Sequence, residues 1–547
     1  MFPRIAAAAA SFALATPALA DPAADTARLF AQWDGSDGPG CAVSVTRDGQ
    51  VAFTGAYGMA VVESRTPNTP QTAFQIGSIS KQFTAFAVHM LAAEGKLSLQ
   101  DDVRKYVPEM HAFPEPITID HLLHHTSGLR DEWMLLLQGR RAEDTITQRD
   151  VLRALYGQRE LNFAPGSRFA YSNSNYTLLA LVVERASGQA FPAFMKARIF
   201  EPLGMTQTYV KDDWRPVRPD TALGYGQGPG GVESRIFPFS AYGAGNVYST
   251  VEDMARWTLN LNDPKVGSPA IVAAMSRTVR GPLAPSRYGS GIEVASYRNL
   301  VALRHGGIAP GAASYMMAVP DRRFGVTVLC NAETNDTGRI AEQIADIHLA
   351  ADLPPPAEPK IELSEDQLRR FVGRYRETGG PVFVLTVRDG RLIIGRDALE
   401  PIAPTAFRLV GAPVHFSFTG PDDAPAAVLN IHDPDQDRIA VRYEEPDAPE
   451  LTPGRMQDYL GRYYSPELGA LMQVERREDQ LWLTGAAFEN RLLQPPVGER
   501  AADAFFTEST IGAIDFSRDE KGRVTGLTQS NGRVVGIRFL KVDLPQL

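Results

Sequence analysis

The sequence of 547 residues holds only two cysteines, and its basic residues do not outnumber its acidic ones. A chain of this length buries a sizeable core by itself, so a small fold stapled by disulfides or metal ions is excluded. Lys and Arg number 55 against 64 Asp and Glu, which gives a formal charge of −9. Without a basic surplus to neutralise phosphates, we expect no nucleic acid partner. The 44% hydrophobic and 22% charged residues are typical of a folded soluble protein, and the length predicts about three domains.

Long apolar runs are also absent after the first twenty residues. Residues 1–4 carry a positive charge, residues 5–15 are apolar, and Ala18-Leu19-Ala20 resembles a signal-peptidase site. A signal peptide over residues 1–20 is therefore predicted. An uncleaved membrane anchor is the alternative, although the apolar run is shorter than the ~20 residues that span a bilayer. We expect an exported protein, periplasmic or secreted, with no stable membrane insertion.

The first predicted domain covers residues 21–352, where strand pairs at both ends enclose a helical middle. Alternating apolar residues bounded by turn signals predict strands at 41–46, 51–57, 312–319 and 324–329. Apolar residues at helical spacing predict a helix at 81–93. The stretch LPPPAEP, which starts at residue 353, predicts a proline-rich linker over 353–363. This linker marks the first domain boundary.

An internal repeat follows the linker. Ser364–Tyr375 and Thr452–Tyr463 align at an offset of 88 residues and share the letters Gly-Arg-Tyr at their ends. Each copy begins with a helix N-cap residue and leads into short alternating runs. Two copies are too few for a solenoid, so we predict two antiparallel β-barrel domains, at residues 364–448 and 449–547.

Lysine is scarce, which makes one pairing easy to see. Of nine lysines, only Lys81 has a serine three residues before it, Ser78. Positions three apart share a helix face, so the Lys81 amine is expected beside the Ser78 hydroxyl. A serine in the first turn of a helix also lies near backbone N–H groups that favour developing negative charge. The pair suits a serine nucleophile, and a capping serine with an exposed lysine is the alternative.

Two further stretches carry chemically useful side chains in the same domain. Tyr171 and Asn173 lie before an apolar helix, and a phenol can relay a proton while an amide can hold a substrate carbonyl. Arg304-His305-Gly306-Gly307 opens the last strand pair, where the glycines would let a substrate backbone approach a strand edge. In this order, the three motifs form a joint signal for acyl-transfer chemistry.

With these motifs the chain resembles the serine hydrolase superfamily of β-lactamases, penicillin-binding proteins and related esterases and D-peptidases, over roughly residues 30–350. Further matching stretches are His124–Leu129, Gly243–Gly245 with Ser249–Met254, Tyr288–Gly291, and Ser127–Trp133. The chain with its two C-terminal modules is most similar to bacterial D-aminopeptidases, which release N-terminal D-residues. The resemblance implies an α/β fold, in which helices flank an antiparallel sheet and two antiparallel β-barrels follow.

The resemblance also implies roles for individual residues. Ser78 would be the acylated nucleophile, with Lys81 and Tyr171 as the proton-transfer pair. Which of the two is the general base stays open. Asn173 would contact the substrate carbonyl, and His305 would be the catalytic basic group of the third motif. Gly306 and Gly307 would bind the substrate, and the backbone N–H groups of Ser78 and Ile308 would form an oxyanion hole. A loop of the last barrel, Gly485–Asn490, is expected to reach back to the site.

Several functions remain open within this superfamily. A lysine in place of His305 would anchor a substrate carboxylate, whereas a histidine, with an ordinary pKa of about 6.5, is largely neutral at pH 7. A free α-amine would need an anion, for which Asp131, Glu132 and Glu489 are candidates. We therefore predict an amidase that acts like a D-aminopeptidase on small D-peptides, amides or esters. The alternatives are a short-chain esterase, a D-Ala-D-Ala carboxypeptidase, and a non-catalytic binding protein on the same fold.

Three lesser features complete the sequence. In the resembled fold, Cys41 and Cys330 lie on neighbouring antiparallel strands, so a disulfide between them is one possibility. Two buried free thiols are slightly favoured, because cysteines on adjacent strands seldom meet the geometry of a disulfide. His121, His124 and His125 have spacings that can bind zinc, but without a metalloprotease glutamate a structural role is expected. We expect no metal and no cofactor. A homodimer is left open.

Overall fold

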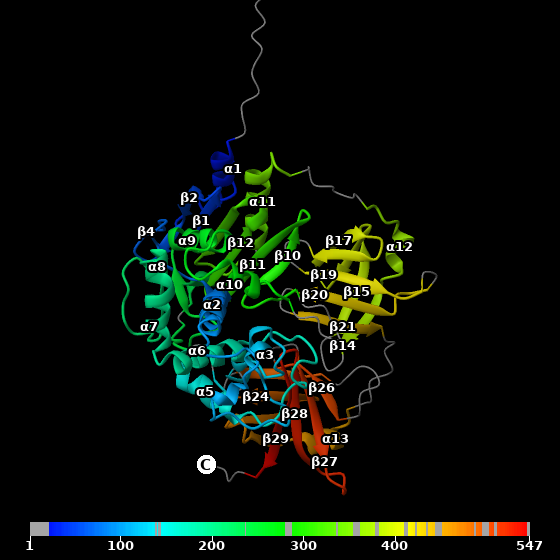
Figure 1. The fold of residues 1–547 in the computed structure, drawn as a ribbon. Helices are drawn as coiled ribbons and strands as arrows, with labels where there is room; N and C mark the ends of the chain where they lie inside the picture. The colour runs from blue at the N-terminus through cyan, green and yellow to red at the C-terminus, as the bar shows by residue number, and fades with distance from the viewer. Residues whose placement is uncertain are drawn as a thin grey trace, which may run out of the picture.

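The protein is described by a computed structural model with three parts, an α/β domain followed by two β-barrels (Figure 1). The described residues are 21–136, 139–140, 144–235, 237–278, 287–334, 337–353, 361–377, 382–395, 397–409, 414–421, 424–433, 436–442, 451–485, 488–494, 503–507 and 511–543. The predicted signal peptide and positions 354–360 of the predicted linker lie outside them. Within the described residues, no helix is both long and apolar enough to cross a membrane.

A six-stranded antiparallel sheet forms the centre of the first domain. Its strands, in spatial order, are β10 (Glu293–Tyr297), β11 (Leu300–Ala309), β12 (Ala312–Val319), β13 (Phe324–Cys330), β1 (Cys41–Arg47) and β2 (Gln50–Tyr57). The predicted strand pairs from the two ends of the domain therefore meet where β1 pairs with β13. Nearly all residues of these two strands are buried, because helices cover both faces of the sheet.

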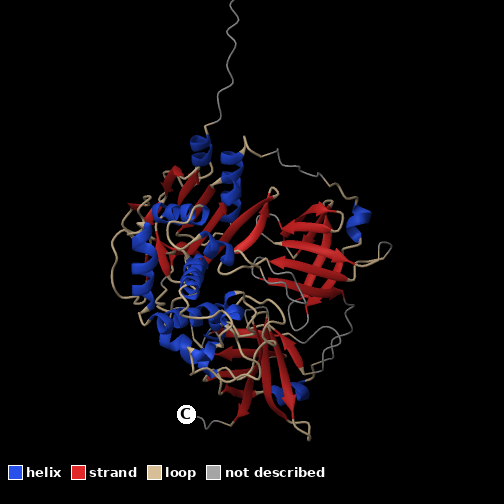
Figure 2. Cartoon of the chain, viewed as in Figure 1, coloured by secondary structure: helices blue, strands red, loops and turns tan. Residues whose placement is uncertain are grey.

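The two faces of this sheet bury different sets of side chains. On one face, Val43, Val326 and Val328 pack against helix α11 (Thr337–Leu349), and α1 (Pro22–Arg28) packs against α11 and β2. On the other, Met316 and Leu329 join a larger core with α2 (Ser80–Ala93), α6 (Asn173–Ser187), α9 (Val251–Asn262) and α10 (Pro269–Met275). This is the helix-flanked sheet that the sequence predicts (Figure 2). The remaining elements of the domain are β3 (Met59–Val61), β4 (Thr66–Pro67), β5 (Phe74–Gln75), η1 (Gly77–Ile79), η2 (Val103–Lys105), α3 (Ile119–Leu123), α4 (Glu132–Leu136), α5 (Gln148–Gly157), α7 (Phe191–Met195), η3 (Lys196–Phe200), α8 (Glu201–Leu203), β6 (Tyr209–Val210), β7 (Tyr225–Gly228), β8 (Gly231–Ser234), β9 (Val247–Ser249) and η4 (Pro320–Arg322).

The two cysteines form a disulfide, so the slightly favoured prediction of two free thiols is wrong. Cys41 begins β1 and Cys330 ends β13, and the antiparallel register places them directly opposite each other. Their Cα atoms are 4.0 Å apart, and both residues are fully buried. The family resemblance implies that these two strand ends are neighbours. Only the register decides whether the cysteines face each other or point to opposite sides of the sheet.

The C-terminal part of the chain forms two eight-stranded β-structures, each preceded by a short helix. The first is a closed barrel with α12 (Glu365–Arg369) and strands β14 (Gly373–Glu377), β15 (Val382–Arg388), β16 (Arg391–Ile394), β17 (Asp397–Ala403), β18 (Ala406–Leu409), β19 (His415–Thr419), β20 (Val428–Asp433) and β21 (Gln436–Arg442). The second has α13 (Pro453–Tyr459) and strands β22 (Gly461–Ser465), β23 (Ala470–Arg477), β24 (Gln480–Gly485), β25 (Phe488–Leu493), β26 (Ala504–Phe506), β27 (Ala513–Arg518), β28 (Val524–Asn531) and β29 (Val534–Val542). Backbone hydrogen bonds between Gln494 and Phe506 nearly close it.

The sequence repeat corresponds to the same local structure in both barrels. Ser364 and Thr452 cap α12 and α13 through their side-chain oxygens. One turn beyond each helix a buried tyrosine, Tyr375 or Tyr463, donates a hydrogen bond to the carbonyl four residues earlier, at 3.1 Å and 2.6 Å. Each tyrosine thereby ties the entering helix to the first barrel strand.

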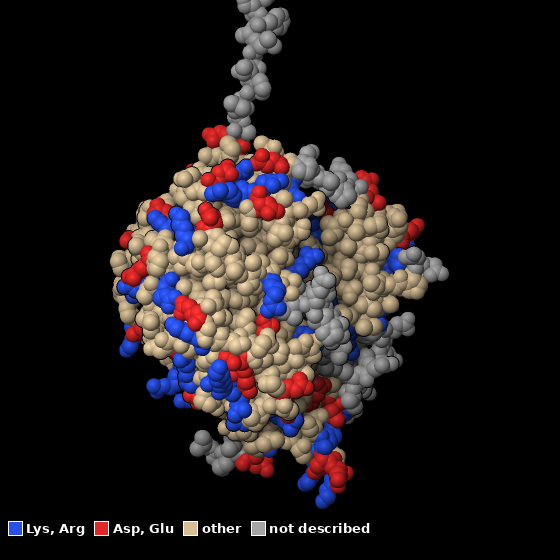
Figure 3. All heavy atoms as spheres, viewed as in Figure 1, with Lys and Arg blue, Asp and Glu red and all other residues tan. Residues whose placement is uncertain are grey.

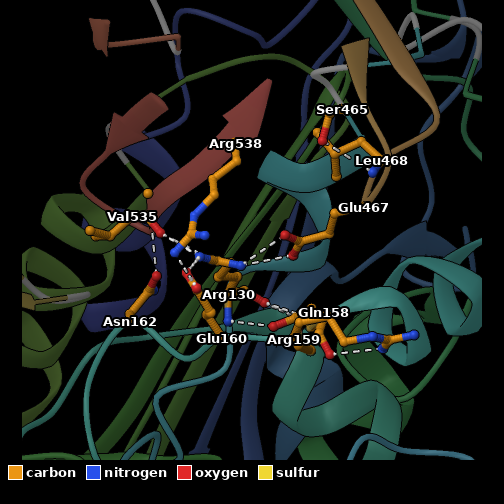
Figure 4. A network of polar contacts seen from close by, with 12 residues as sticks. Arg130, Gln158, Arg159, Glu160, Asn162, Ser465, Glu467, Leu468, Val535 and Arg538 are labelled. Atoms are coloured by element: carbon orange, nitrogen blue, oxygen red, sulfur yellow. Dashed lines mark hydrogen bonds and ion pairs between the residues drawn. The ribbon is translucent and has the colours of Figure 1, made fainter. Parts of the chain in front are cut away.

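The second barrel contacts the first domain through a buried arginine (Figure 4). The Arg130 guanidinium donates to both carboxylate oxygens of Glu467, at 2.8 and 3.1 Å, and to the Val535 carbonyl at 2.8 and 3.1 Å. Arg130 is 1% exposed. Across the same interface, the Val535 N–H donates to the Asn162 side chain at 2.9 Å.

Figure 3 shows acidic and basic side chains interspersed on one face of the molecule, without a patch of one sign.

Candidate active site

Ser78 lies in η1, the single turn that leads directly into α2. Gly77 before it has a φ of +50°, and a Cβ there would lie 2.7 Å from the Ile308 backbone nitrogen. Gly307 is equally constrained, since its Cβ would lie 2.1 Å from the Ile76 carbonyl oxygen. The two glycines therefore let the turn with Ser78 pack directly against strand β11. This close approach brings the backbone of Ser78 and that of Ile308 to the same wall of the site.

The Lys81 amine lies next to the Ser78 hydroxyl. Its Nζ donates to Ser78 Oγ at 3.0 Å, to Asn173 Oδ1 at 2.8 Å and to the Ala244 carbonyl at 2.7 Å. Lys81 is fully buried, whereas Ser78 is accessible in part. Two permanent acceptors thus take two N–H groups, and the third position of the nitrogen faces the serine. Once Lys81 has given up a proton, an amine held this way would present its lone pair to the Ser78 proton and could act as the base.

Tyr171 packs against the same amine. Lys81 Nζ lies 4.8 Å from the centre of the Tyr171 ring, and the Arg533 guanidinium carbon lies 5.2 Å from it. The His125 ring is 4.3 Å from the Tyr171 ring, centre to centre. Burial, with the positive charges of Lys81 and other neighbours, holds the pKa of His125 well below 6.5. His125 therefore stays neutral, and its Nδ1 accepts hydrogen bonds from the Ser172 backbone and the Asn175 amide.

Asp131 holds Asn173 in place. Its Oδ2 accepts from the backbone N–H of Asn173 at 2.7 Å and from the Asn173 amide at 3.0 Å. The Asn173 amide oxygen is thereby turned toward Lys81. The backbone N–H of Asp131 in turn donates to the Arg533 carbonyl at 3.2 Å. A continuous series of hydrogen bonds therefore connects the second barrel with Ser78.

His305 forms the opposite wall on strand β11. Its Nδ1 faces the Gly306 carbonyl, which can only accept, so Nδ1 carries a proton. Its Nε2 lies 3.0 Å from the Tyr288 hydroxyl. A tyrosine hydroxyl both donates and accepts, so the Tyr288 contact suits Nε2 in either protonation state. Unlike a lysine, His305 brings no fixed positive charge to this position.

These residues surround one cavity of about 810 Å³. The sequence-predicted residues Ser78, Tyr171, Asn173, His305, Gly306, Gly307 and Ile308 all line it. Lys81 lies behind Ser78. The structure therefore brings together the eight residues for which the sequence predicts catalytic or substrate-binding roles.

Glu132 is a further acidic group in the cavity wall. It is 3% exposed, and Thr177 donates to its Oε1 at 2.8 Å. No described residue donates a hydrogen bond to Oε2. Burial, and secondly the neighbouring Asp131, raise the pKa of Glu132 from 4.5 to about 8. A buried carboxyl with an unpartnered oxygen can receive a cation from a ligand.

Residues from both barrels complete the cavity, and sequence reasoning missed them. Val414 of the first barrel and Arg533 of the second line it. Arg533 lies in the turn between β28 and β29, and its carbonyl accepts from the Asn162 amide at 3.0 Å. The stretch Gly485–Asn490, expected to reach the site, supplies none of the described lining residues, and positions 486 and 487 lie outside the described residues. No local pattern marks a turn that reaches a site in another domain.

The histidine cluster has structural contacts. Thr118 caps α3 by accepting from the His121 backbone, and His121 Nδ1 accepts from the Thr118 backbone. His124 lies between the carbonyls of Asp120 and Arg277. Over the described parts of the chain, no group of three or more His, Cys, Asp or Glu residues is arranged to hold a metal ion.

A serine and a lysine at the start of the central helix, against an antiparallel sheet, define the class of serine hydrolases related to penicillin-binding proteins. The family model described as Beta-lactamase matches residues 26–350, and the chain belongs to this family. D-aminopeptidase of Gluconobacter oxydans (strain 621H) is 31% identical over 380 residues, which cover 67% of this chain and 70% of the relative. Protein flp of Staphylococcus aureus (strain MRSA252) is 30% identical over 322 residues, which cover 56% of this chain and 62% of the relative.

Solved structures share the fold. A penicillin-binding protein homologue from Pyrococcus abyssi matches with a TM-score of 0.56 and 25% identity, over 76% of this chain and 99% of the other. A D-stereospecific amidohydrolase from Streptomyces sp. matches with a TM-score of 0.50 and 24% identity, over 60% of this chain and 98% of the other. The expected fold, helices flanking an antiparallel sheet followed by two barrels, is confirmed.

Proposed function

We propose that the protein is an exported amidase that releases N-terminal D-residues from small peptides and amides through a Ser78 acyl-enzyme. The observation that carries the proposal is the buried Glu132 carboxyl in the cavity wall. The 31% identity to a D-aminopeptidase supports the same reaction. A short-chain esterase and a D-Ala-D-Ala carboxypeptidase remain the competing functions.

In the proposed reaction, Ser78 Oγ attacks the substrate carbonyl carbon while its proton passes to Lys81 or Tyr171. The oxyanion accepts hydrogen bonds from the backbone N–H groups of Ser78 and Ile308. The C–N bond then breaks, the leaving amine takes the proton, and the acyl group stays on Ser78. Water, deprotonated by the same base, attacks the ester and releases the free acid. Asn173 orients the substrate and holds Lys81.

The position of Glu132 suits a substrate amine. Its partner Thr177 lies one helical turn after Asn173 on α6, and helix positions four apart share a face. The threonine that holds the carboxyl therefore lies about 6 Å along the helix from the residue that contacts Lys81. In an N-terminal residue the α-amine is two bonds from the scissile carbonyl carbon. A carbonyl beside Ser78 thus places the amine toward Glu132, where an ammonium would ionise the carboxyl.

His305 supports the same choice among the competing functions. A carboxypeptidase substrate carries a carboxylate, and His305 lacks the fixed positive charge with which a lysine at this position would anchor it. Export is proposed from residues 1–20 and from the disulfide between Cys41 and Cys330, because disulfides persist in oxidising compartments.

The test compares four substrates: D-alanine p-nitroanilide, its N-acetylated form, a peptide ending in D-Ala-D-Ala, and p-nitrophenyl acetate. We expect the free amine to be cleaved fastest among the amides, and the L-alanine anilide to be slower. Glu132→Gln should lower kcat/KM for the free amine more than for the acetylated form. Glu520→Gln, at an exposed position of the second barrel, is the matched control. Faster cleavage of the acetylated amide would refute the proposal, and cleavage of the ester alone would establish the esterase.

A further inference from the structure

Beyond Glu132, the wall of the cavity is aromatic. Trp133, Phe237 and Phe239 all line it. The Trp133 ring meets the two phenylalanine rings edge to face, at 5.6 and 5.9 Å between centres, and the phenylalanines stack on each other at 4.9 Å. Such arrangements are those that aromatic rings prefer. The three rings form one cluster, called here the aromatic wall.

Two short segments hold the aromatic wall beside the carboxyl. On α4, residues Glu132, Trp133 and Leu136 all line the cavity, as positions i, i+1 and i+4 of one helix face do. Phe237 and Phe239 flank a tight turn at Pro238, in which the Phe239 N–H donates to the Phe237 carbonyl at 2.8 Å, and their rings stack on each other. The backbone beside Phe239 is fixed, because the Ser240 N–H donates to the Ile146 carbonyl at 2.9 Å.

All three rings of the aromatic wall are only partly buried by the protein itself. They leave apolar surface facing the cavity, which a ligand can cover. The volume of about 810 Å³ also exceeds what an alanine amide fills, since cavities of roughly 300 to 1,000 Å³ hold drug-sized ligands. Neither feature is needed for a substrate with a methyl side chain.

We propose that the aromatic wall is the subsite for the side chain of the substrate's N-terminal residue, and that it selects a large apolar, preferably aromatic, D-residue. This rests on the proposed aminopeptidase function. The α-carbon that carries the amine also carries the side chain. An amine at Glu132 therefore brings the side chain to the neighbouring position on α4, which is Trp133. Contact with three rings favours a phenyl group over a methyl group.

The test measures kcat/KM for the p-nitroanilides of D-phenylalanine, D-alanine and D-lysine, each with a free amine. We expect D-phenylalanine to exceed D-alanine by about 10- to 100-fold, the range that apolar pockets achieve. Trp133→Ala should reduce that ratio by about tenfold, because the phenyl group loses its largest contact surface. Trp214→Ala changes a tryptophan that is 41% exposed and outside the cavity lining, so the ratio should stay at its wild-type value.

Three results would overturn the proposal: a D-alanine rate equal to or above that of D-phenylalanine, a faster D-lysine anilide, or an unchanged ratio in Trp133→Ala. If Trp133→Ala does not fold, the wild-type protein answers the question through the competitive inhibition constants of D-phenylalanine amide and D-alanine amide. The first should be at least tenfold lower. N-acetylated anilides separate the two proposals. If they are cleaved faster than the free amines, the aminopeptidase function is refuted. The ratio of kcat/KM for the D-phenylalanine anilide to that for the D-alanine anilide tests the aromatic wall in either case.

Discussion

Replacing Glu132 with Gln should increase the stability of the protein by an amount that grows with pH. In the folded protein, burial raises the pKa of this carboxyl from 4.5 to about 8. The folded state therefore holds the proton over a range of pH in which the unfolded chain releases it. Stability that depends on this proton is fully present below pH 4.5 and is lost as the pH rises toward 8.

The magnitude follows from the two pKa values. Keeping the Glu132 carboxyl protonated lowers the free energy of unfolding of the wild type by less than about 1 kcal/mol at pH 5 and by about 3 kcal/mol at pH 7. Gln keeps the acceptor for Thr177 and carries no titratable proton. Relative to wild type, the free energy of unfolding of Glu132→Gln should therefore rise by about 2 to 3 kcal/mol between pH 5 and pH 7. For a domain of this size that corresponds to about 3 to 4 °C in Tm.

The assay is thermal unfolding of both proteins at pH 5, 6, 7 and 8, following the transition of the α/β domain. Glu520→Gln, exposed on the second barrel, should show the wild-type pH dependence. The reasoning is refuted if the difference between Glu132→Gln and wild type is constant over this range, or if it shrinks as the pH rises. The same variant should lose its preference for a free α-amine, so stability and function would change in opposite directions.

Ser78→Ala should abolish turnover of amides and esters and the covalent adduct that intact-mass spectrometry detects with a fluorophosphonate; retained activity would contradict the nucleophile. Lys81→Ala and Tyr171→Phe should each lower kcat by about 10² to 10⁴, measured with the same anilide, and an unchanged kcat in either would exclude that residue from proton transfer. Glu467→Ala removes the bidentate partner of buried Arg130, which among the described residues then keeps only the Val535 carbonyl and, at 3.6 Å, the half-exposed Glu160 carboxylate. The change should cost about 3 kcal/mol in urea unfolding and lower kcat, because Arg533 contacts the site from the same barrel; a stable, fully active variant would show that the interface is unimportant. Alkylation without reductant should modify neither cysteine, and two labelled cysteines would disprove the disulfide.

Local patterns reveal most of the catalytic constellation. Ser78 and Lys81 are three residues apart at a helix start, so their contact follows from helix geometry alone. Tyr171 and Asn173 are separated by one residue, and His305 is followed by two glycines on a strand. Each of these groups is recognisable within a few letters. The duplicated barrels are visible for the same reason, since each copy repeats a capped helix and a buried tyrosine.

The roles of Asp131 and Glu132 show where local reasoning stops. The two carboxyls are adjacent in the chain and both were candidates for an amine site. In the fold, Asp131 turns inward and holds Asn173, whereas Glu132 borders the cavity beside Thr177. Their sequence neighbourhood is the same. Their orientation depends on the packing of α4 against α6, which no short pattern specifies.

Residue spacings within single helices, strands and repeats thus predict the class of chemistry, the strand pairs around a helical middle and the two barrels, whereas the helix-flanked sheet is implied by the family resemblance that the motifs carry. The tertiary structure alone decided three things: the disulfide between Cys41 and Cys330, the entry of Arg533 into the site, and the aromatic wall beside Glu132. Each joins segments that are distant in the chain. Such contacts depend on strand register and on how separate packed units meet, and both are set by the burial of side chains from the whole molecule.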